Sequence, residues 1–232
     1  MLYLISTGLY DEKDMSLRAV ETAKKCDVLY AEFYTDRTGT DIARLGKTIG
    51  KKITEIERKE LEENIEKIIK EAKIKDVGIL VGGDALTATT HASVLLAAKE
   101  AGVKCRVIHG SSVLTAVGET GLQLYKFGKT ATLTRNFEKS IYETIQLNKK
   151  LGLHTLVLLD IGMTAADGLK ILAKKMQDEV KVVVACSLGM NETIEYKKIK
   201  NLVKNKNLDK TPAVIIIPGK LHFMEEELLE AL

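Results

Sequence analysis

The chain has 232 residues, of which 45% are hydrophobic and 29% charged, so it is long enough for one large α/β domain or two small ones. Its formal net charge is only +3, which gives no electrostatic reason to expect nucleic acid as a direct partner. No apolar run reaches the roughly 18 residues of a transmembrane helix, and the opening residues, MLYLISTGLYDE, are typical of a strand and not of a signal peptide.

Short β-branched and aliphatic runs alternate with longer segments of helical periodicity along the chain. The predicted strands are 2–6, 28–33, 77–82, 104–108, 129–134, 154–160, 181–186 and 213–217. The predicted helices lie near 16–25, 40–49, 59–73, 87–101, 112–118, 138–150, 164–177, 191–204 and 224–231. Ser16 and Thr164 are the expected N-caps of two of these helices. Strands that alternate with helices favour a mainly parallel sheet covered on both faces.

A weak domain boundary falls within residues 109–128, where glycine and small polar residues are dense. We interpret this segment as a hinge between two α/β domains, residues 1–110 and residues 111–232. Each half then has an ordinary domain size.

Loops that contain glycine follow the carboxyl ends of five predicted strands: STGLYDE, GGDALT, HGSS, DIGMT and SLGM. In open α/β sheets, ligands bind just beyond these ends, and glycine lets the backbone approach a ligand closely. Turn chemistry explains any single loop of this kind, but five together favour a ligand site. Taken alone, Asp84 is best interpreted as a cap of the next helix. The alternative is that its carboxylate binds hydroxyls or an amino group of a ligand.

Several other kinds of site are disfavoured by spacing. FGKT at 127–130 is not a P-loop, because Gln123 stands where the motif needs glycine and the segment leads into a predicted strand. The four histidines do not have metal-ligand spacing, and no serine lies in a nucleophile elbow. The three distant cysteines are typical of buried thiols in a reducing cytoplasm. The basic segment 196–210 is expected to be a solvated helix and loop.

Four segments occur in this order: GDALTATTH, HGSSVLTAVGETGLQLYKFGKTATL, NKKLGLHTLVLLDI and PGKLHFMEEELL. Together with GLYDEKDMSLRA and AEFYT near the start, they resemble the tetrapyrrole methylase family of S-adenosyl-L-methionine-dependent methyltransferases. The run GLQLYKFGKT is similar to the branch of the family that modifies translation elongation factor 2, and separates it from the corrin and precorrin methylases.

The resemblance implies two α/β domains, with the cofactor S-adenosyl-L-methionine in a cleft between them, and a homodimer. It implies repeated methylation, to the trimethylated form, of the amino group on an aminocarboxypropyl-modified histidine of elongation factor 2, in diphthamide biosynthesis. Neither a metal nor a membrane is implied. Two alternatives stay open: a methyltransferase of a corrin or precorrin, and a homologue that binds without turnover.

Matched position by position, the resemblance implies a set of cofactor contacts from both halves of the chain. They are Leu9, Asp84, Thr87, Ser112, Val113, Leu159, Leu188 and His222. No catalytic base is identified. The chain departs from the family at Ala85, where proline is usual, and at Cys186 and Ser187, where an Ala-Arg pair is usual. Its loops near 134–142 and 161–164 are shorter than usual.

Overall fold

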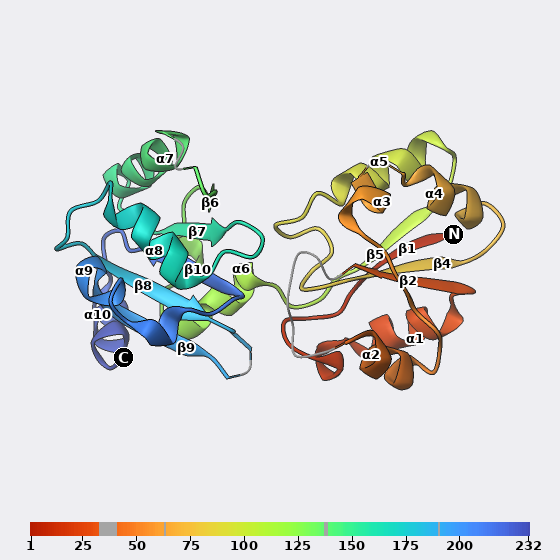
Figure 1. The fold of residues 1–232 in the computed structure, drawn as a ribbon, viewed down its shortest axis with the longest axis horizontal. Helices are drawn as coiled ribbons and strands as arrows, with labels where there is room; N and C mark the ends of the chain where they lie inside the picture. Colours follow the sequence, from red (N-terminus) through yellow and green to blue (C-terminus); the bar gives the residue numbers. More distant parts are fainter. Residues whose placement is uncertain (33–40, 63, 137–138, 190) are drawn as a thin grey trace. The chain divides into compact units, whose positions relative to one another are not determined.

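The computed structural model describes residues 1–232 except 33–40, 63, 137–138 and 190 (Figure 1). It divides into two compact units, Met1–Leu114 and Thr115–Leu232, and each is built around one five-stranded sheet. The expected α/β class with two sheets is confirmed. The sequence placed the domain boundary after residue 110, and the structure divides after Leu114.

The sheet of the first unit has the strand order β3-β2-β4-β1-β5, and all its neighbouring strands are parallel. Its strands are β1 (Leu2–Ser6), β2 (Val28–Glu32), β3 (Thr54–Glu55), β4 (Val77–Val81) and β5 (Cys105–Ile108). Its helices are η1 (Glu12–Asp14), α1 (Leu17–Lys25), α2 (Ile42–Ile49), α3 (Arg58–Glu62), α4 (Glu66–Ala72) and α5 (Ala92–Glu100). The predicted parallel sheet is therefore confirmed in this half.

Helices cover both faces of this first sheet (Figure 1). One apolar cluster packs α3, α4 and α5 against one face and includes Leu61, Ile68 and Val94. Another packs α1 and α2 against the opposite face and includes Ala19 and Leu45. Burying one aliphatic side chain of this size contributes about 1.5–3 kcal/mol. The two clusters therefore stabilise the sheet from both faces and hold the strand ends, from which the loops start, in place.

The sheet of the second unit is mixed, with the order β6-β7-β10-β8-β9. Its strands are β6 (Ala131–Leu133), β7 (Thr155–Leu159), β8 (Lys181–Cys186), β9 (Thr193–Lys198) and β10 (Ala213–Ile217). Only β6 and β7 are parallel, whereas the other neighbours are antiparallel. The prediction of a mainly parallel sheet is wrong for this half. The connection between β8 and β9 is too short for the crossover that parallel neighbours need.

The predicted helix 191–204 is also wrong over its first half, where TIEYKK forms β9. Ile194 and Tyr196 favour a strand, and β9 pairs in register with β8, placing Tyr196 opposite Val183. The segment 196–210, expected to be a helix and loop, therefore begins in a strand. The preference of Lys and Glu for helices is overridden here by pairing with a buried neighbour.

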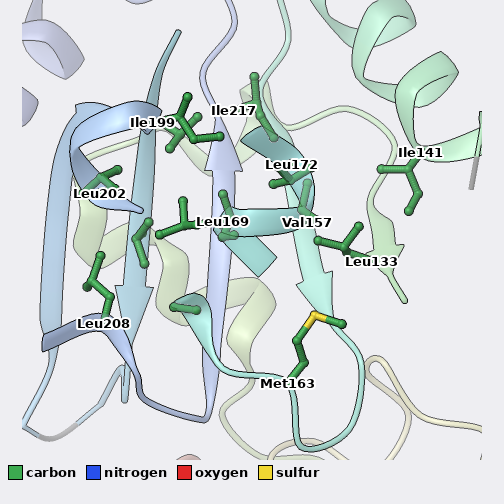
Figure 2. Close-up of a cluster of buried hydrophobic side chains, with 14 of the residues drawn as sticks. Leu133, Ile141, Val157, Met163, Leu169, Leu172, Ile199, Leu202, Leu208 and Ile217 are labelled. Atoms are coloured by element: carbon green, nitrogen blue, oxygen red, sulfur yellow. The ribbon is translucent and has the colours of Figure 1, made fainter. Parts of the chain in front are cut away.

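The helices and 3-10 turns from residue 113 onward are α6 (Val113–Ala116), η2 (Val117–Thr120), η3 (Leu124–Lys126), α7 (Lys139–Lys150), α8 (Ala165–Ala173), α9 (Ile199–Leu202), η4 (Lys206–Leu208) and α10 (Phe223–Glu230). Figure 2 shows the main apolar cluster of the second unit, where Leu169 and Leu172 of α8 lie beside Val157 of β7. Ile199 and Leu202 extend the same cluster towards α9.

Both predicted N-caps are confirmed. The Ser16 hydroxyl accepts a hydrogen bond from the Ala19 N–H at 3.1 Å, and the Thr164 hydroxyl accepts one from Asp167 at 3.2 Å. The predicted helix 87–101 instead begins at Ala92. The prediction at 59–73 corresponds to α3 and α4.

Parts of some predictions lie outside the described residues. They are the ends of elements placed at 33, 40 and 138, position 63 within a predicted helix, part of the loop near 134–142, Met190 of SLGM and part of AEFYT. In the part of the chain that the structure describes, no helix is both long and apolar enough to cross a membrane.

The cysteines are free thiols. Cys26 and Cys186 are buried, as predicted, and Cys105 is half-buried. Burial raises the pKa of each thiol to about 11. None of them is therefore a ready thiolate nucleophile at neutral pH.

Candidate functional site

Three neighbouring strands of the first sheet, β4, β1 and β5, end at the same edge because they are parallel. The loops that follow them, residues 82–84, 7–9 and 109–112, therefore lie next to one another. This edge is where open α/β sheets bind ligands. It joins three of the five glycine loops that the sequence analysis singled out.

Gly8 and Gly83 join the first two loops through a pair of backbone hydrogen bonds. Gly8 N–H donates to the Gly83 carbonyl at 3.2 Å, and Gly83 N–H donates to the Gly8 carbonyl at 2.8 Å. Their φ angles are +89° and +65°, in the region that favours glycine. A Cβ on Gly8 would lie 2.3 Å from Cβ of Asp14. The two paired glycines therefore present backbone without side chains, and this pair is called the glycine wall below.

Asp84, which follows these glycines, ties the loop after β4 to the loop after β5. Its Oδ1 accepts hydrogen bonds from the Leu86 N–H at 3.0 Å and the Thr87 hydroxyl at 3.2 Å. Its Oδ2 accepts from the His109 ring Nδ1 at 2.8 Å and the Gly110 N–H at 3.1 Å. The interpretation of Asp84 as a helix cap is wrong, because α5 begins only at Ala92.

The Asp84 carboxylate is buried but charged. Burial by itself raises its pKa, but the hydrogen bonds from Leu86, Gly110 and His109 outweigh burial and hold the pKa below its ordinary value. The charged form is favoured because every one of these partners donates to it. The edge therefore carries a fixed negative charge at neutral pH.

Gly110 fits between the ends of β5 and β1 only because it has no side chain. A Cβ there would lie 2.7 Å from Cβ of Ser6. The Ser6 hydroxyl accepts a hydrogen bond from Ala85 N–H at 2.9 Å, so the three loops are joined by side chains as well as by backbone. The site edge is therefore rigidly built.

The structure brings several of the predicted cofactor residues to this edge. Thr87 contacts Asp84 directly through its hydroxyl. Leu9 follows Gly8 and is half-buried, whereas Ser112 is buried at the end of the loop after β5. Val113 begins α6.

The remaining three predicted residues are in the second unit, and they do not all follow the same end of its sheet. Leu159 is the last residue of β7, and Leu188 follows β8. Between those strands, β10 runs antiparallel to both. His222 follows β10, so it comes after the opposite end of the sheet. There it is the N-cap of α10, and its Nδ1 accepts from the Met224 N–H at 3.4 Å.

At that opposite end lies a buried charge network around Glu225, which the sequence analysis did not identify. Its Oε1 accepts from Gln123 N–H at 2.9 Å and from His154 Nε2 at 3.0 Å. Its Oε2 accepts from His222 N–H at 2.7 Å and from the Lys126 ammonium. The network therefore joins GLQLYKFGKT, LGLH and PGKLHFMEEE, segments that are far apart in the sequence.

The protonation state of this network follows from its donors. Burial would raise the pKa of Glu225, but Lys126, the two backbone N–H groups and His154 lower it to about 2. Burial lowers the pKa of His154, which keeps its ring neutral. Gly219 N–H donates to His154 Nδ1 at 2.9 Å, so Nε2 carries the hydrogen that Glu225 accepts.

The sequence analysis considered His154 only for metal-ligand spacing and placed Glu225 in the predicted helix near 224–231. The sequence carries no local signal for this network, because its segments meet only in the folded second unit. A Cβ on Gly219 would lie 2.4 Å from the Leu153 carbonyl oxygen, and one on Gly128 would lie 2.2 Å from Asn148 Oδ1. Such crowding indicates closely packed turns and not a phosphate loop, and FGKT indeed leads into β6.

The edge of the first sheet fits S-adenosyl-L-methionine. That molecule carries a cationic sulfonium and a cationic ammonium, and the buried Asp84 supplies a fixed negative charge. Gly83 leaves room for close approach, because a Cβ added there would have no neighbour nearer than the Ser111 carbonyl oxygen at 4.0 Å. Within the described residues, no group of three or more His, Cys, Asp or Glu side chains is placed to hold a metal ion.

Comparison with known proteins agrees with this architecture. Residues 1–203 match the family model of the tetrapyrrole (corrin/porphyrin) methylases. The chain is 44% identical to the diphthine synthase of Methanocaldococcus jannaschii, with 100% of this chain and 98% of the relative covered. The diphthine synthase of Methanococcus aeolicus is 41% identical, with the same coverage.

The solved structures agree as well. A crystal structure of diphthine synthase superimposes with a TM-score of 0.94 at 36% identity, over 99% of this chain and 94% of that one. The structure of an Entamoeba histolytica protein gives 0.91 at 32% identity, over 100% and 97%. The chain therefore belongs to the tetrapyrrole methylase family, and it is similar over its whole length to the diphthine synthases of that family.

Proposed function

We propose that this S-adenosyl-L-methionine-dependent methyltransferase acts on translation elongation factor 2. Its substrate there is a histidine that carries an aminocarboxypropyl group, and the amino nitrogen is methylated, in the end to the trimethylated form. The observation that carries this proposal is the full-length similarity to diphthine synthases at 44% and 41% identity. We further propose that the chain works in the cytoplasm as a homodimer.

When bound, S-adenosyl-L-methionine supplies a methyl group that its positive sulfur already activates, so the transfer needs no Lewis acid. What remains for the protein is positioning and removal of water, which contribute much of the rate in such reactions. Asp84 is suited to attract the cationic part of the methyl donor. Its four lone-pair positions are already in use, so this attraction acts through charge.

The remaining cofactor contacts are proposed from the family resemblance. Leu9, Thr87, Ser112 and Val113 supply apolar surface and hydroxyls beside the glycine wall, and these suit an adenine and a ribose. Leu159, Leu188 and His222 are the proposed contacts from the second unit. Because His222 follows the opposite end of its sheet from Leu159 and Leu188, it is the member of this set most in need of a direct test.

Mass spectrometry of the modified factor tests the proposed reaction. After incubation with the chain and S-adenosyl-L-methionine, one peptide should gain successive methyl masses, and EDTA should leave the rate unchanged. A precorrin incubated in parallel should stay unmodified. Methylation of the precorrin alone would establish the corrin alternative instead.

A third outcome is tied to chain length. The alignment with the Methanocaldococcus jannaschii protein runs over 254 positions, whereas this chain has 232 residues, so the relative has segments that this chain lacks. If neither substrate changes although calorimetry shows that the methyl donor binds, the chain is a binding-only homologue. Sedimentation at micromolar concentration tests the homodimer, and a strict monomer would contradict it.

A further inference from the structure

The loop after β5 presents a histidine whose ring is held by a buried carboxylate. His109 Nδ1 lies 2.8 Å from Asp84 Oδ2. The side chain of Asp84 is only 8% exposed, whereas that of His109 is 69% exposed. Nε2 of His109 has no hydrogen-bond partner among the residues that the structure describes. Nδ1 of the ring is therefore held by Asp84, whereas Nε2 is available to a ligand or to solvent.

The carboxylate decides which nitrogen of His109 carries the hydrogen. A charged carboxylate can only accept, and the hydrogen bonds from Leu86 and Gly110 help to keep Asp84 charged. Nδ1 of His109 must therefore be the N–H donor. In the neutral ring, Nε2 is then a bare lone pair that is directed away from Asp84.

The reaction needs a group of this kind. An amine attacks the methyl carbon only when it is unprotonated, and at neutral pH an alkylamine is mostly an ammonium ion. Each transfer returns a positive charge to the nitrogen, so a proton must leave again before the next methyl group can be added. A base beside the site is therefore used repeatedly within one substrate.

We propose that His109 is the proton acceptor of this methyltransferase and that Asp84 is the residue that positions it. The inference rests on the proposed function, because it requires an amine as the nucleophile. Nε2 takes a proton from the substrate ammonium, while Nδ1–H stays hydrogen-bonded to Asp84. The freed lone pair forms the new N–C bond as the S–C bond breaks, and that electron pair remains on sulfur. The proton then leaves His109 for solvent through its exposed edge.

Other groups at this edge are less suited to the role. In the loops 7–9, 82–84 and 109–112, only Asp84 and His109 are titratable. Asp84 is buried, with all its acceptor positions used. His91 lies near the same edge but is buried, with Nδ1 at 3.1 Å from the Ala85 carbonyl and Nε2 at 3.6 Å from Glu32. His109 is therefore the exposed base of this set.

The kinetic test compares His109→Ala and His109→Gln with Arg106→Gln, an exposed control on β5, the strand that precedes His109. With modified elongation factor 2 in excess, the His109 variants should lose about 100-fold or more in kcat, the usual scale of general base catalysis. Free imidazole should restore part of the rate of His109→Ala. Calorimetry should show S-adenosyl-L-methionine binding within about twofold of wild type.

A structural test needs no turnover. Long-range ¹H–¹⁵N spectra of the ¹⁵N-histidine-labelled chain should show the Nδ1–H form of His109, assigned by its loss in His109→Gln. Asp84→Asn removes the charge that selects this form, so the ring should become a mixture of tautomers. An Nε2–H ring in the wild type would overturn the assignment.

The outcomes separate the two proposals. If the wild type methylates the factor and the His109 variants keep their kcat, His109 is not the base. A rise in KM with kcat unchanged would also overturn the inference, because it would make His109 a substrate-binding residue. If the wild type leaves the factor unmethylated, the proposed function itself fails, and the role of His109 fails with it.

Discussion

Asp84 in the first unit and Glu225 in the second are buried carboxylates with closely matched partners. Each accepts four hydrogen bonds: two from backbone N–H groups, one from a histidine ring and one from another side chain. They differ in what surrounds them. The histidine beside Asp84 is 69% exposed, whereas the one beside Glu225 is fully buried.

This difference indicates a ligand site at Asp84 and a purely structural contact, called the structural joint below, at Glu225. Glu225 has the half-buried Lys126 ammonium as a counter-ion and a neutral histidine as a further donor, so its charge is balanced within the fold. Asp84 has no lysine or arginine among its described partners, and its fourth donor is the Thr87 hydroxyl. A carboxylate held charged without a permanent counter-ion is suited to a cationic ligand, whereas a balanced one holds segments together.

The largest effect is expected at the structural joint. Glu225→Ala leaves Lys126, His154 and the backbone N–H groups of Gln123 and His222 without their acceptor. Breaking such a buried pair costs about 3–5 kcal/mol of unfolding free energy. Urea unfolding followed by circular dichroism measures it, and Glu226→Ala, at an exposed neighbour on the same helix, should stay within about 0.5 kcal/mol. A loss below 1 kcal/mol would make the network incidental.

At the site, Asp84→Ala should act mainly on ligand binding. We expect S-adenosyl-L-methionine affinity to fall by about 1.5–3 kcal/mol, the scale of an interaction with a charged group. Calorimetry on the variant measures this, with thermal melting as the parallel readout. If melting drops while affinity is unchanged, Asp84 is only a joint like Glu225, and the comparison between the two carboxylates loses its meaning.

Gly110→Ala should lower the free energy of unfolding, because the added methyl group has no room between the ends of β5 and β1. The new Cβ would lie 2.7 Å from Cβ of Ser6, and overpacking of this kind typically costs about 1–3 kcal/mol. Because Gly110 also donates to Asp84, binding of the methyl donor should weaken together with stability. Gly118→Ala is the matched control, since its nearest neighbour atom would be 3.8 Å away. Equal stability losses in both variants would refute the crowding argument.

Lowering the pH should reduce the free energy of unfolding of the second unit in two stages. The folded state holds the pKa of His154 below 6.5, so below pH 6.5 the unfolded chain binds a proton that the folded chain does not, and stability falls. The pKa of Glu225 is lowered from 4.5 to about 2, so a second loss follows between pH 4.5 and 2. Each stage has a slope of at most about 1.4 kcal/mol per pH unit.

Urea unfolding at pH 7, 5.5 and 4 measures the first stage. His154→Gln should flatten the decline between pH 6.5 and 5, because no proton is then taken up at this position on unfolding. A decline of the same slope in this variant would assign the first stage to another group.

The sequence predicted the first unit well and the second less well, for physical reasons. The strands of a parallel sheet, buried on both faces, are short apolar runs such as VGILV, and these are readily recognised. In contrast, TIEYKK in β9 is an edge strand rich in charge, and only its pairing with β8 makes it a strand. The antiparallel insertion of β10 between β7 and β8 leaves no local trace in the sequence.

For the site, the glycine loops predict a ligand at the edge where β4, β1 and β5 end, because glycine lets the backbone approach a ligand closely. The pairing of Asp84 with His109 could not be predicted from spacing. The two residues are brought together by the adjacency of β4, β1 and β5, which is a property of the sheet order. For the same reason Glu225, Lys126 and His154 gave no signal, since their segments meet only in the folded second unit.

The position of β10 has a consequence for synthesis of the chain on the ribosome. The first sheet has all its strands once residue 108 has been made, whereas the second sheet lacks a central strand until residues 213–217 emerge. Domains generally fold as units, the N-terminal one first, while translation proceeds. A nascent chain halted near residue 208 should therefore have a protease-resistant first unit and a protease-sensitive second one, with two half-sheets awaiting the strand that joins them.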